Sequence, residues 1–241
     1  MDLALSNRTA LVTGASKGIG RAIALSLAAQ DAHVIAVARA SDDLASLADE
    51  FGERGETWAQ DASSDAFLDR IGALERLDVL VNNLGTNRPK PMVEVSDDDL
   101  DVMINLNLRS LYRITRAAVP LMQTGAAIVN VSSQMGHVGS PGRTVYCMTK
   151  HGVEGLTKAL AVELADQGIR VNSVAPTFIE TPMTKPMLAD PKFSQFVRDS
   201  IPLGKVGSVE DVADAVLYLA SPAAKMVTGH SLLVDGGWTA Q

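Results

Sequence analysis

Short apolar runs recur along the chain, and amphipathic segments with helical spacing stand between them. Strands that are buried on both faces read as nearly continuous apolar runs, and their alternation with helices is typical of a parallel sheet covered on both faces. The pattern therefore predicts an α/β protein with a doubly wound parallel sheet of about seven strands. The expected strands are residues 9–13, 34–38, a short run ending near residue 60, 77–81, 127–131, 171–175 and 231–234.

The helical segments expected between these strands are residues 19–30, 43–51, 97–122 with a break near Leu106, and 145–166. No repeat, low-complexity tract or charge block interrupts the alternation, so residues 1–241 are predicted to form a single domain. Residues 177–203 have no clear pattern and are rich in Pro, Met and Thr. A long irregular segment after a central strand is commonly a lid, so a substrate lid is favoured over an ordered surface helix with no role in chemistry.

Composition limits the cellular setting. Hydrophobic residues make up 46% of the chain, but no run approaches the roughly 20 apolar residues of a membrane span. The stretch Met1–Ser6 lacks the basic and apolar regions of a secretory signal, and a lone Cys147 fits a reducing compartment. These features predict a cytoplasmic protein without a membrane-embedded part.

Charge and histidine spacing exclude two further classes of function. The formal net charge of −7 opposes binding to nucleic acid, whose affinity rests on a basic face that neutralises phosphates. The four histidines stand far apart, and none has metal-ligand spacing to Cys, Asp or Glu. We therefore expect neither a nucleic-acid partner nor a protein-bound catalytic metal.

A glycine-rich loop follows the first predicted strand and opens the first helix. It reads Thr13-Gly14-Ala15-Ser16-Lys17-Gly18-Ile19-Gly20. In this context, glycines permit a tight turn and let backbone N–H groups and the helix N-terminus approach a pyrophosphate. The spacing differs from G-x-G-x-x-G, because three residues separate Gly14 from Gly18 and one separates Gly18 from Gly20. The loop predicts a dinucleotide site.

Tyr146 and Lys150 lie four positions apart in a predicted helix, with Ser133 thirteen residues before Tyr146. Positions i and i+4 share a helix face, so the ammonium can ease deprotonation of a phenol that otherwise titrates near pH ~10. A tyrosine needs such a cation to exchange protons at neutral pH. Alone the spacing is common, so its meaning depends on the rest of the chain.

The motifs together resemble those of the short-chain dehydrogenase/reductase family. The glycine loop, Asn82-Asn83-Leu84-Gly85 and Ser133 with Tyr146-x-x-x-Lys150 occur in that family's order and separation, over essentially the whole chain. The resemblance implies a Rossmann-like fold and hydride transfer between a nicotinamide and a ketone or secondary alcohol. Within the family, the chain is similar to bacterial sugar dehydrogenases, xylulose and carbonyl reductases, and 3-oxoacyl-[acyl-carrier-protein] reductases.

The resemblance assigns catalytic roles to four residues. Tyr146 exchanges a proton with the substrate oxygen, and Lys150 lowers the pKa of Tyr146 and holds the nicotinamide ribose. Ser133 hydrogen-bonds the same oxygen, while Asn107 anchors a water that links Lys150 to solvent. Two preplaced hydroxyls suit the negative charge that hydride delivery builds on a carbonyl oxygen.

Two neighbouring residues compete for these roles. Successive residues on a strand face opposite sides, so Ser132 is the alternative to Ser133, and Asn105 is likewise the alternative to Asn107. The family spacing favours Ser133 and Asn107. Cys147, beside Tyr146, has no base to activate it and is expected to be a packing residue.

Charge at the end of the second strand bears on the choice of cofactor. An acidic residue there would repel a 2′-phosphate, whereas this chain has Arg39, with Lys17 on the same side. NADP(H) is therefore favoured over NAD(H), the alternative being that Arg39 is only solvated and is cancelled by Asp42 and Asp43. The resemblance implies a set of cofactor-binding residues: Gly14, Ser16, Lys17, Gly18, Ile19, Gly20, Arg39, Asp61, Ala62, Asn83, Gly85, Tyr146, Lys150, Pro176, Ile179 and Thr181.

The substrate is defined less sharply. Gln134, His137 and Arg143 are candidate contacts, and their polarity favours a sugar, a polyol or a small carbonyl compound. A 3-oxoacyl-[acyl-carrier-protein] reductase is the main alternative, but Thr124 and Gln167 stand where such enzymes carry basic carrier-docking residues. A non-catalytic nucleotide-sensing protein is a remote alternative, and family resemblance implies a homotetramer.

The turn after the sixth predicted strand departs from the family pattern. Thr177 follows Pro176 where many members have glycine, and Thr lacks the freedom of glycine at positive φ. A different turn is therefore expected above the nicotinamide.

Overall fold

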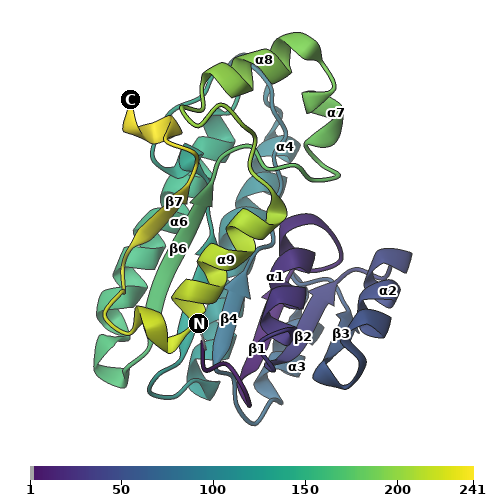
Figure 1. The fold of residues 1–241 in the computed structure, drawn as a ribbon, viewed down its shortest axis with the longest axis vertical. Coiled ribbons are helices and arrows are strands. Elements are labelled where there is room, and N and C mark those ends of the chain that lie inside the picture. The colour runs from purple at the N-terminus through teal and green to yellow at the C-terminus, as the bar shows by residue number, and fades with distance from the viewer. Residues whose placement is uncertain (1–2) are drawn as a thin grey trace.

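The computed structural model describes residues 3–241 and contains one parallel sheet of seven strands in the order β3-β2-β1-β4-β5-β6-β7 (Figure 1). Met1 and Asp2, on which the expectation of a missing secretory signal partly rests, lie outside the described residues. The predicted doubly wound α/β fold is confirmed. The strands are β1 (Thr9–Thr13), β2 (His33–Ala38), β3 (Gly55–Ala59), β4 (Val79–Asn82), β5 (Ala127–Val131), β6 (Arg170–Pro176) and β7 (Ser231–Val234).

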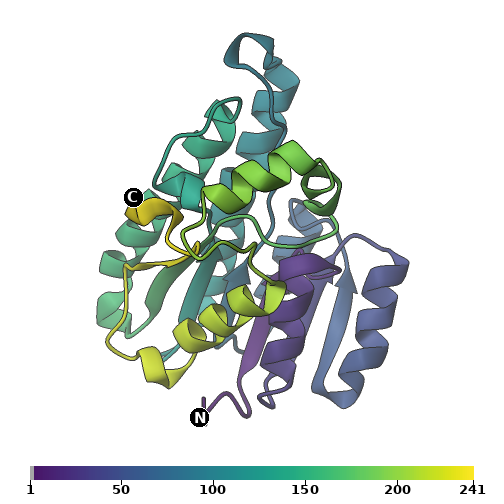
Figure 2. The same ribbon diagram turned by 45° about the horizontal axis from the view of Figure 1, so that its top comes forward.

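Alternate strand residues build two cores, one on each face of the sheet. Ala10 and Val12 of β1 pack with α1 and α9, whereas Leu11 between them packs with α3, α5 and α6. Both views show α1 and α9 in front of the sheet (Figure 2). The α-helices within residues 3–241 are α1 (Gly18–Ala28), α2 (Asp42–Phe51), α3 (Asp65–Gly72), α4 (Asp97–Ile104), α5 (Ser110–Ala118), α6 (Thr144–Glu163), α7 (Lys185–Leu188), α8 (Pro191–Asp199) and α9 (Val209–Ala220). None of them has the length and hydrophobicity that crossing a bilayer requires.

The structure also differs from the sequence expectations. Helices α3 and α9 were not predicted, although each begins at a recognisable cap: the Ser64 side chain accepts from the Phe67 N–H, and Ser208 and Asp211 form a capping box. The expected break near Leu106 is a π-helical turn, Asn105–Arg109, between α4 and α5. The fourth strand begins two residues later than predicted and includes Asn82.

Residues 177–203 are more ordered than expected, because they contain α7 and α8. This segment lies beyond the carboxyl ends of the strands, at the top of Figure 1. Its first residues line the cavities described below. The segment is therefore partly helical and lines the cavities, and its role as a substrate lid stays a prediction. Thr177 has no positive φ, so replacement of the usual glycine causes no backbone strain.

Candidate active site

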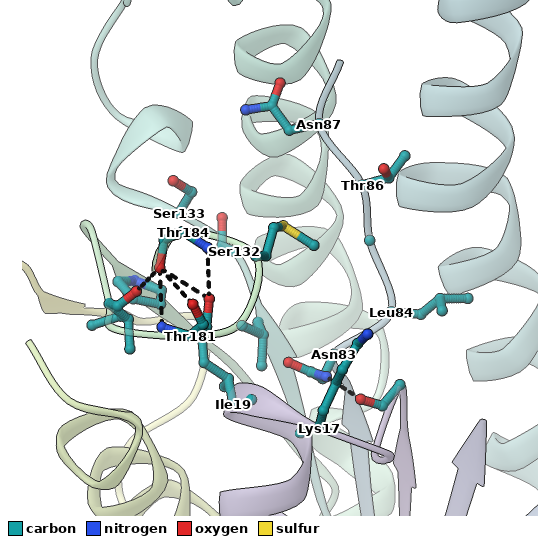
Figure 3. A pocket seen from close by; sticks show the side chains of 18 of the residues that line it. Lys17, Ile19, Asn83, Leu84, Thr86, Asn87, Ser132, Ser133, Thr181 and Thr184 are labelled. Atoms are coloured by element: carbon teal, nitrogen blue, oxygen red, sulfur yellow. Dashed lines mark hydrogen bonds between the residues drawn. The ribbon is translucent and has the colours of Figure 1, made fainter. Parts of the chain in front are cut away.

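A cavity of 310 Å³ lies at the carboxyl ends of the central strands, between the start of α1 and residues 181–184 (Figure 3). In an open parallel sheet this is where ligands bind. A second cavity of 680 Å³ lies next to the end of β2, and a third of 160 Å³ lies next to Tyr146. Every cofactor-binding residue expected from the sequence lines the first or the second cavity.

The glycine loop has the shape that its sequence predicts. Gly14 and Gly18 have φ values of +66° and +57°, and a Cβ atom on Gly20 would lie 2.3 Å from the Gly14 carbonyl oxygen. The Asn83 side chain fixes the loop from the other side, because its Nδ2 donates to the carbonyls of Thr13 (3.0 Å) and Gly14 (3.2 Å). Backbone can therefore approach a ligand closely here, as a pyrophosphate requires.

Thr13 is a contributor that sequence reasoning missed. Its hydroxyl is buried and accepts from the N–H groups of Asn83 (3.1 Å) and Leu84 (3.2 Å). These bonds tie the end of β1 to the segment after β4. A threonine that ends a strand gives no distinctive signal, since its partners lie about seventy residues away along the chain.

The second cavity carries two free cations. Lys17 and Arg39 line it, and within the described chain neither side chain makes a hydrogen bond or an ion pair. Asp61 also lines it, but its Oδ1 accepts from the N–H and the hydroxyl of Ser63, which lowers the pKa of the carboxyl, and Arg39 adds to this effect. No ion pair joins Arg39 to Asp42 or Asp43, which favours a free cation over a cancelled one. The residues present fit a nicotinamide dinucleotide, with positive charge at the adenosine end.

Tyr146 and Lys150 both line the first cavity from α6. The Lys150 Nζ atom donates to the Val131 carbonyl (2.8 Å) and lies 5.6 Å from the centre of the Tyr146 ring. Burial lowers the pKa of Lys150 to about 8, against partial opposition from Glu154. Its ammonium is thus held at the end of β5, facing the cavity.

The pKa of Tyr146 departs from the sequence expectation. Burial raises it, and the opposing influences are a hydrogen bond with Ser133 and the charge of Arg143. The Lys150 Nζ is directed to the Val131 carbonyl, and Arg143 is a second cation whose charge acts on the phenol in the direction expected of Lys150. The role of Lys150 in lowering the pKa of Tyr146 stays a prediction.

The two serines after β5 face different surroundings. Ser133 lines both the first cavity and the one beside Tyr146, and its Oγ accepts from the Met135 N–H at 3.1 Å. Ser132 lines only the first cavity, and its buried Oγ has no partner within the described residues. Ser133 is thus the serine that reaches the phenol, in agreement with the spacing argument.

Asn107 lies in the π-helical turn and is buried, whereas Asn105 is exposed. Its side chain exchanges two hydrogen bonds with the backbone of Thr86 (2.8 and 2.9 Å) and donates to the Thr149 hydroxyl (3.0 Å). A Cβ atom on Gly85 would lie 3.4 Å from Asn107 Oδ1 and 3.8 Å from Lys150 Nζ. Asn107 therefore connects the segment after β4 to α6, close to Lys150. Its role in holding a water stays a prediction.

The third cavity lies beside Tyr146, under the segment that begins at Thr177. Gln134 and Arg143 line it, as expected for substrate contacts. His137 does not: its Nε2 lies 2.9 Å from Ser231 Oγ and 3.5 Å from Glu154 Oε1. The short helical turn after Ser133 directs the His137 ring toward β7, so its role as a substrate contact stays a prediction that the lining of this cavity does not support.

Thr184 is a second contributor that the sequence did not reveal. Its hydroxyl donates to the Ile179 carbonyl and accepts from the Thr181 N–H at 3.0 Å, as the dashed lines in Figure 3 show. These bonds close the turn that brings Thr181 over the first cavity. Within residues 3–241, no group of three or more His, Cys, Asp or Glu side chains is arranged to hold a metal ion.

The comparisons with known proteins agree with this geometry. A family model described as "Enoyl-(Acyl carrier protein) reductase" matches residues 14–239. The L-xylulose reductase of Mesocricetus auratus is 42% identical, with 99% of each chain covered. The 3-oxoacyl-[acyl-carrier-protein] reductase FabG of Vibrio harveyi is 40% identical, covering 97% of this chain and 98% of its own. A candidate NAD(P) dependent gluconate 5-dehydrogenase from Beutenbergia cavernae, solved with NADP bound at low occupancy, superposes with a TM-score of 0.95 at 36% identity, with 100% of each chain covered.

The fold and the site define a nicotinamide-dependent oxidoreductase of the CH–OH/carbonyl class. The chain belongs to the short-chain dehydrogenase/reductase family.

Proposed function

We propose that this protein is an NADP(H)-dependent oxidoreductase that interconverts a ketone and a secondary alcohol in a sugar, a polyol or a small carbonyl compound. The observation that carries the proposal is the position of Tyr146 and Ser133 where two cavities meet. Both residues line the cavity that begins at the glycine loop and the smaller cavity under residues 177–187. A substrate oxygen placed between them is within reach of both hydroxyls.

Each residue of the site has a defined task in this proposal. In reduction, the Tyr146 hydroxyl gives its proton to the carbonyl oxygen, and Ser133 stabilises the negative charge that develops there. Lys150 holds the nicotinamide ribose and keeps a positive charge close to the phenol. When bound, the reduced nicotinamide supplies the hydride. Asn107 holds the Gly85–Thr86 backbone against α6, so that Tyr146 and Lys150 on this helix keep their positions relative to that backbone.

The preference for NADP(H) is supported by Lys17 and Arg39. Both side chains line the second cavity, and within the described residues neither makes a hydrogen bond or an ion pair. A 2′-phosphate would give each of them an anionic partner. The candidate gluconate 5-dehydrogenase structure, which holds NADP at low occupancy, lends further support. The test is a panel of sugars, polyols and a short acetoacetyl thioester, each assayed with NADP(H) and NAD(H). Equal turnover with both cofactors would overturn the preference.

An acyl-carrier-protein reductase is the second candidate, because the family model and the Vibrio harveyi relative both carry such descriptions. The carrier-docking positions weigh against it. Thr124 and Gln167 are exposed and uncharged, and the Thr124 hydroxyl donates to the Gln167 carbonyl at 3.1 Å. Fast reduction of the acetoacetyl thioester, without any sugar or polyol activity, would establish this candidate instead.

We also propose a cytoplasmic homotetramer. Large apolar side chains are exposed on two neighbouring helices and on the last strand: Tyr112 of α5 (53%), Met148 of α6 (49%) and Leu233 of β7 (39%). Contact between subunits would remove these surfaces from water. Light scattering at micromolar protein concentration tests the assembly, and a monomeric mass would contradict it.

A further inference from the structure

The cavity beside Tyr146 has one charged side chain, which is Arg143. Within the described residues, its guanidinium makes no hydrogen bond and no ion pair, although the side chain is half-buried. No Asp or Glu lines this cavity in the described part of the chain. A partly desolvated guanidinium, with five N–H donors and no acceptor among the protein groups around it, favours a ligand that brings a negatively charged acceptor.

The other cations near this rim differ from Arg143, because they are already neutralised. Arg88 pairs with Asp98 and Asp99 (2.9 Å each), and the Lys90 ammonium pairs with Asp99. The backbone N–H of Lys90 donates to the Gly142 carbonyl, so the segment that carries these pairs adjoins the residue before Arg143. Burial lowers the pKa of Arg143, with the charges of Tyr146 and Cys147 opposing, so the nearest protein groups do not complete its coordination.

The same cavity has an unusual share of unpartnered polar atoms. Three buried side-chain oxygens that lack a hydrogen bond belong to residues lining it: Asn87 Oδ1, Gln134 Oε1 and Thr177 Oγ1. Gln134 is only 2% exposed. Buried polar atoms are normally paired, so three orphans around one cavity indicate a ligand that donates hydrogen bonds. Hydroxyl groups on the ligand would satisfy them.

The size of the cavity limits the ligand. Its volume is 160 Å³, and a cavity of about 150 Å³ holds a benzene-sized molecule. A chain of five or six carbons with its carbonyl at Tyr146 would therefore place its far end among these side chains.

We propose that Arg143 binds a carboxylate of the substrate, so that the preferred substrates are small hydroxylated keto acids and the sugar acids formed from them. This inference rests on the proposed function and deepens it. In reduction, the hydride passes from the reduced nicotinamide to the carbonyl carbon, and the Tyr146 proton passes to its oxygen. The carboxylate is unchanged, and the orphan oxygens of Asn87, Gln134 and Thr177 accept from substrate hydroxyls.

The first test compares substrate pairs that differ at one terminal carbon: gluconate with glucitol, and xylonate with xylitol, in the direction of oxidation. We expect kcat/KM of the wild type to be at least about tenfold higher for the acids, because hydrogen bonds to charged groups are the strong ones. Arg143→Gln should lower kcat/KM by roughly 10- to 100-fold more for the acids than for the polyols, because loss of its charge beside Tyr146 affects both kinds of substrate alike. Arg143→Lys should restore part of the loss.

Two controls accompany this test. Arg54→Gln removes a cation from an exposed position away from the cavities and should retain the wild-type preference. Titration of Arg143→Gln with NADPH, followed by nucleotide fluorescence, should give the wild-type affinity and so establish that the variant is folded.

A binding measurement separates this inference from the proposed function. Calorimetric titration of the NADP⁺ complex with gluconate and with glucitol, at matched ionic strength, should show tighter binding of gluconate to the wild type but not to Arg143→Gln. Polyols bound and oxidised as well as acids by the wild type would overturn the inference and leave the proposed function standing. Absence of nicotinamide-linked turnover with every compound would overturn the proposed function, and the calorimetric comparison would still decide the role of Arg143.

Discussion

The glycine loop and the substrate cavity meet at Tyr146, but they differ in which part of the chain gives them their shape. The loop is shaped by backbone: two glycines at positive φ, a third without room for a side chain, and carbonyls held by Asn83. The cavity under residues 177–187 is shaped by side chains from separate segments, several of which lack partners. Cofactor binding therefore depends largely on the backbone conformation of the glycine loop, whereas substrate choice depends on a few polar side chains.

Replacing Tyr146 by phenylalanine should have the largest effect, because it removes the group shared by both regions. Loss of the proton donor should lower kcat by roughly 10²- to 10⁴-fold. Binding of NADPH, measured by fluorescence titration, should stay within about threefold of wild type, since the glycine loop is untouched. A variant with wild-type kcat would refute the role of Tyr146.

Gly20→Ala tests how far cofactor binding depends on the backbone conformation of the glycine loop. The new methyl group would lie 2.3 Å from the Gly14 carbonyl oxygen and 2.4 Å from Asn83 Nδ2, so the loop must shift. We expect NADPH affinity to fall by at least roughly tenfold and the free energy of unfolding to fall by about 1–3 kcal/mol. Gly72→Ala is the matched control, since nothing lies within 4 Å of its added Cβ. An unchanged affinity in Gly20→Ala would contradict the close packing of the loop.

Arg39→Ala addresses a part of the cofactor region that depends on side-chain charge. Loss of its charge should weaken binding of NADPH by about tenfold, as expected for a hydrogen bond between charged groups, and leave NADH unaffected. The dissociation constants of both cofactors, for wild type and variant, measure this. Equal loss for the two cofactors would place Arg39 outside a 2′-phosphate site.

The smallest effect concerns Lys150, which stands between the two regions. Its pKa is about 8 in the folded protein against an ordinary value of 10.5. Between these values the unfolded chain binds more protons than the folded one, so this group makes the free energy of unfolding rise with pH across that window. Urea unfolding of wild type and Lys150→Met should therefore diverge above pH 8 in favour of the wild type. A constant difference through the window would mean that Lys150 is not buried as described.

The fold and the cofactor region could be predicted because their signals are local. Glycine spacing and apolar runs are properties of neighbouring residues, and they predicted the observed loop and the parallel sheet of about seven strands. Helices α3 and α9 were not predicted, although their caps at Ser64 and Ser208 are visible in the sequence. The local pattern of capping residues is sufficient to indicate where both helices begin.

The substrate region could be predicted only in part, because its contacts join distant segments. Arg143 and Gln134 line the cavity as expected, whereas His137, three residues after Gln134, turns away to Ser231 on β7. The influence of Arg143 on the pKa of Tyr146 was also missed, since three residues of separation say nothing about the direction of either side chain. Such orientations are set by tertiary packing.

The π-helical turn at Asn105–Arg109 has a consequence for how this sequence can vary. A π-helical turn holds one residue more than an α-helical one, so deleting a single residue there could restore a regular helix at little local cost. Because one full turn would remain, α4 and α5 would keep the faces that they bury. The change would fall on Asn107, which would lose its position beside Thr86 and Thr149. The extra residue in this turn thus serves the placement of the Asn107 side chain and is not needed for the packing of the two helices.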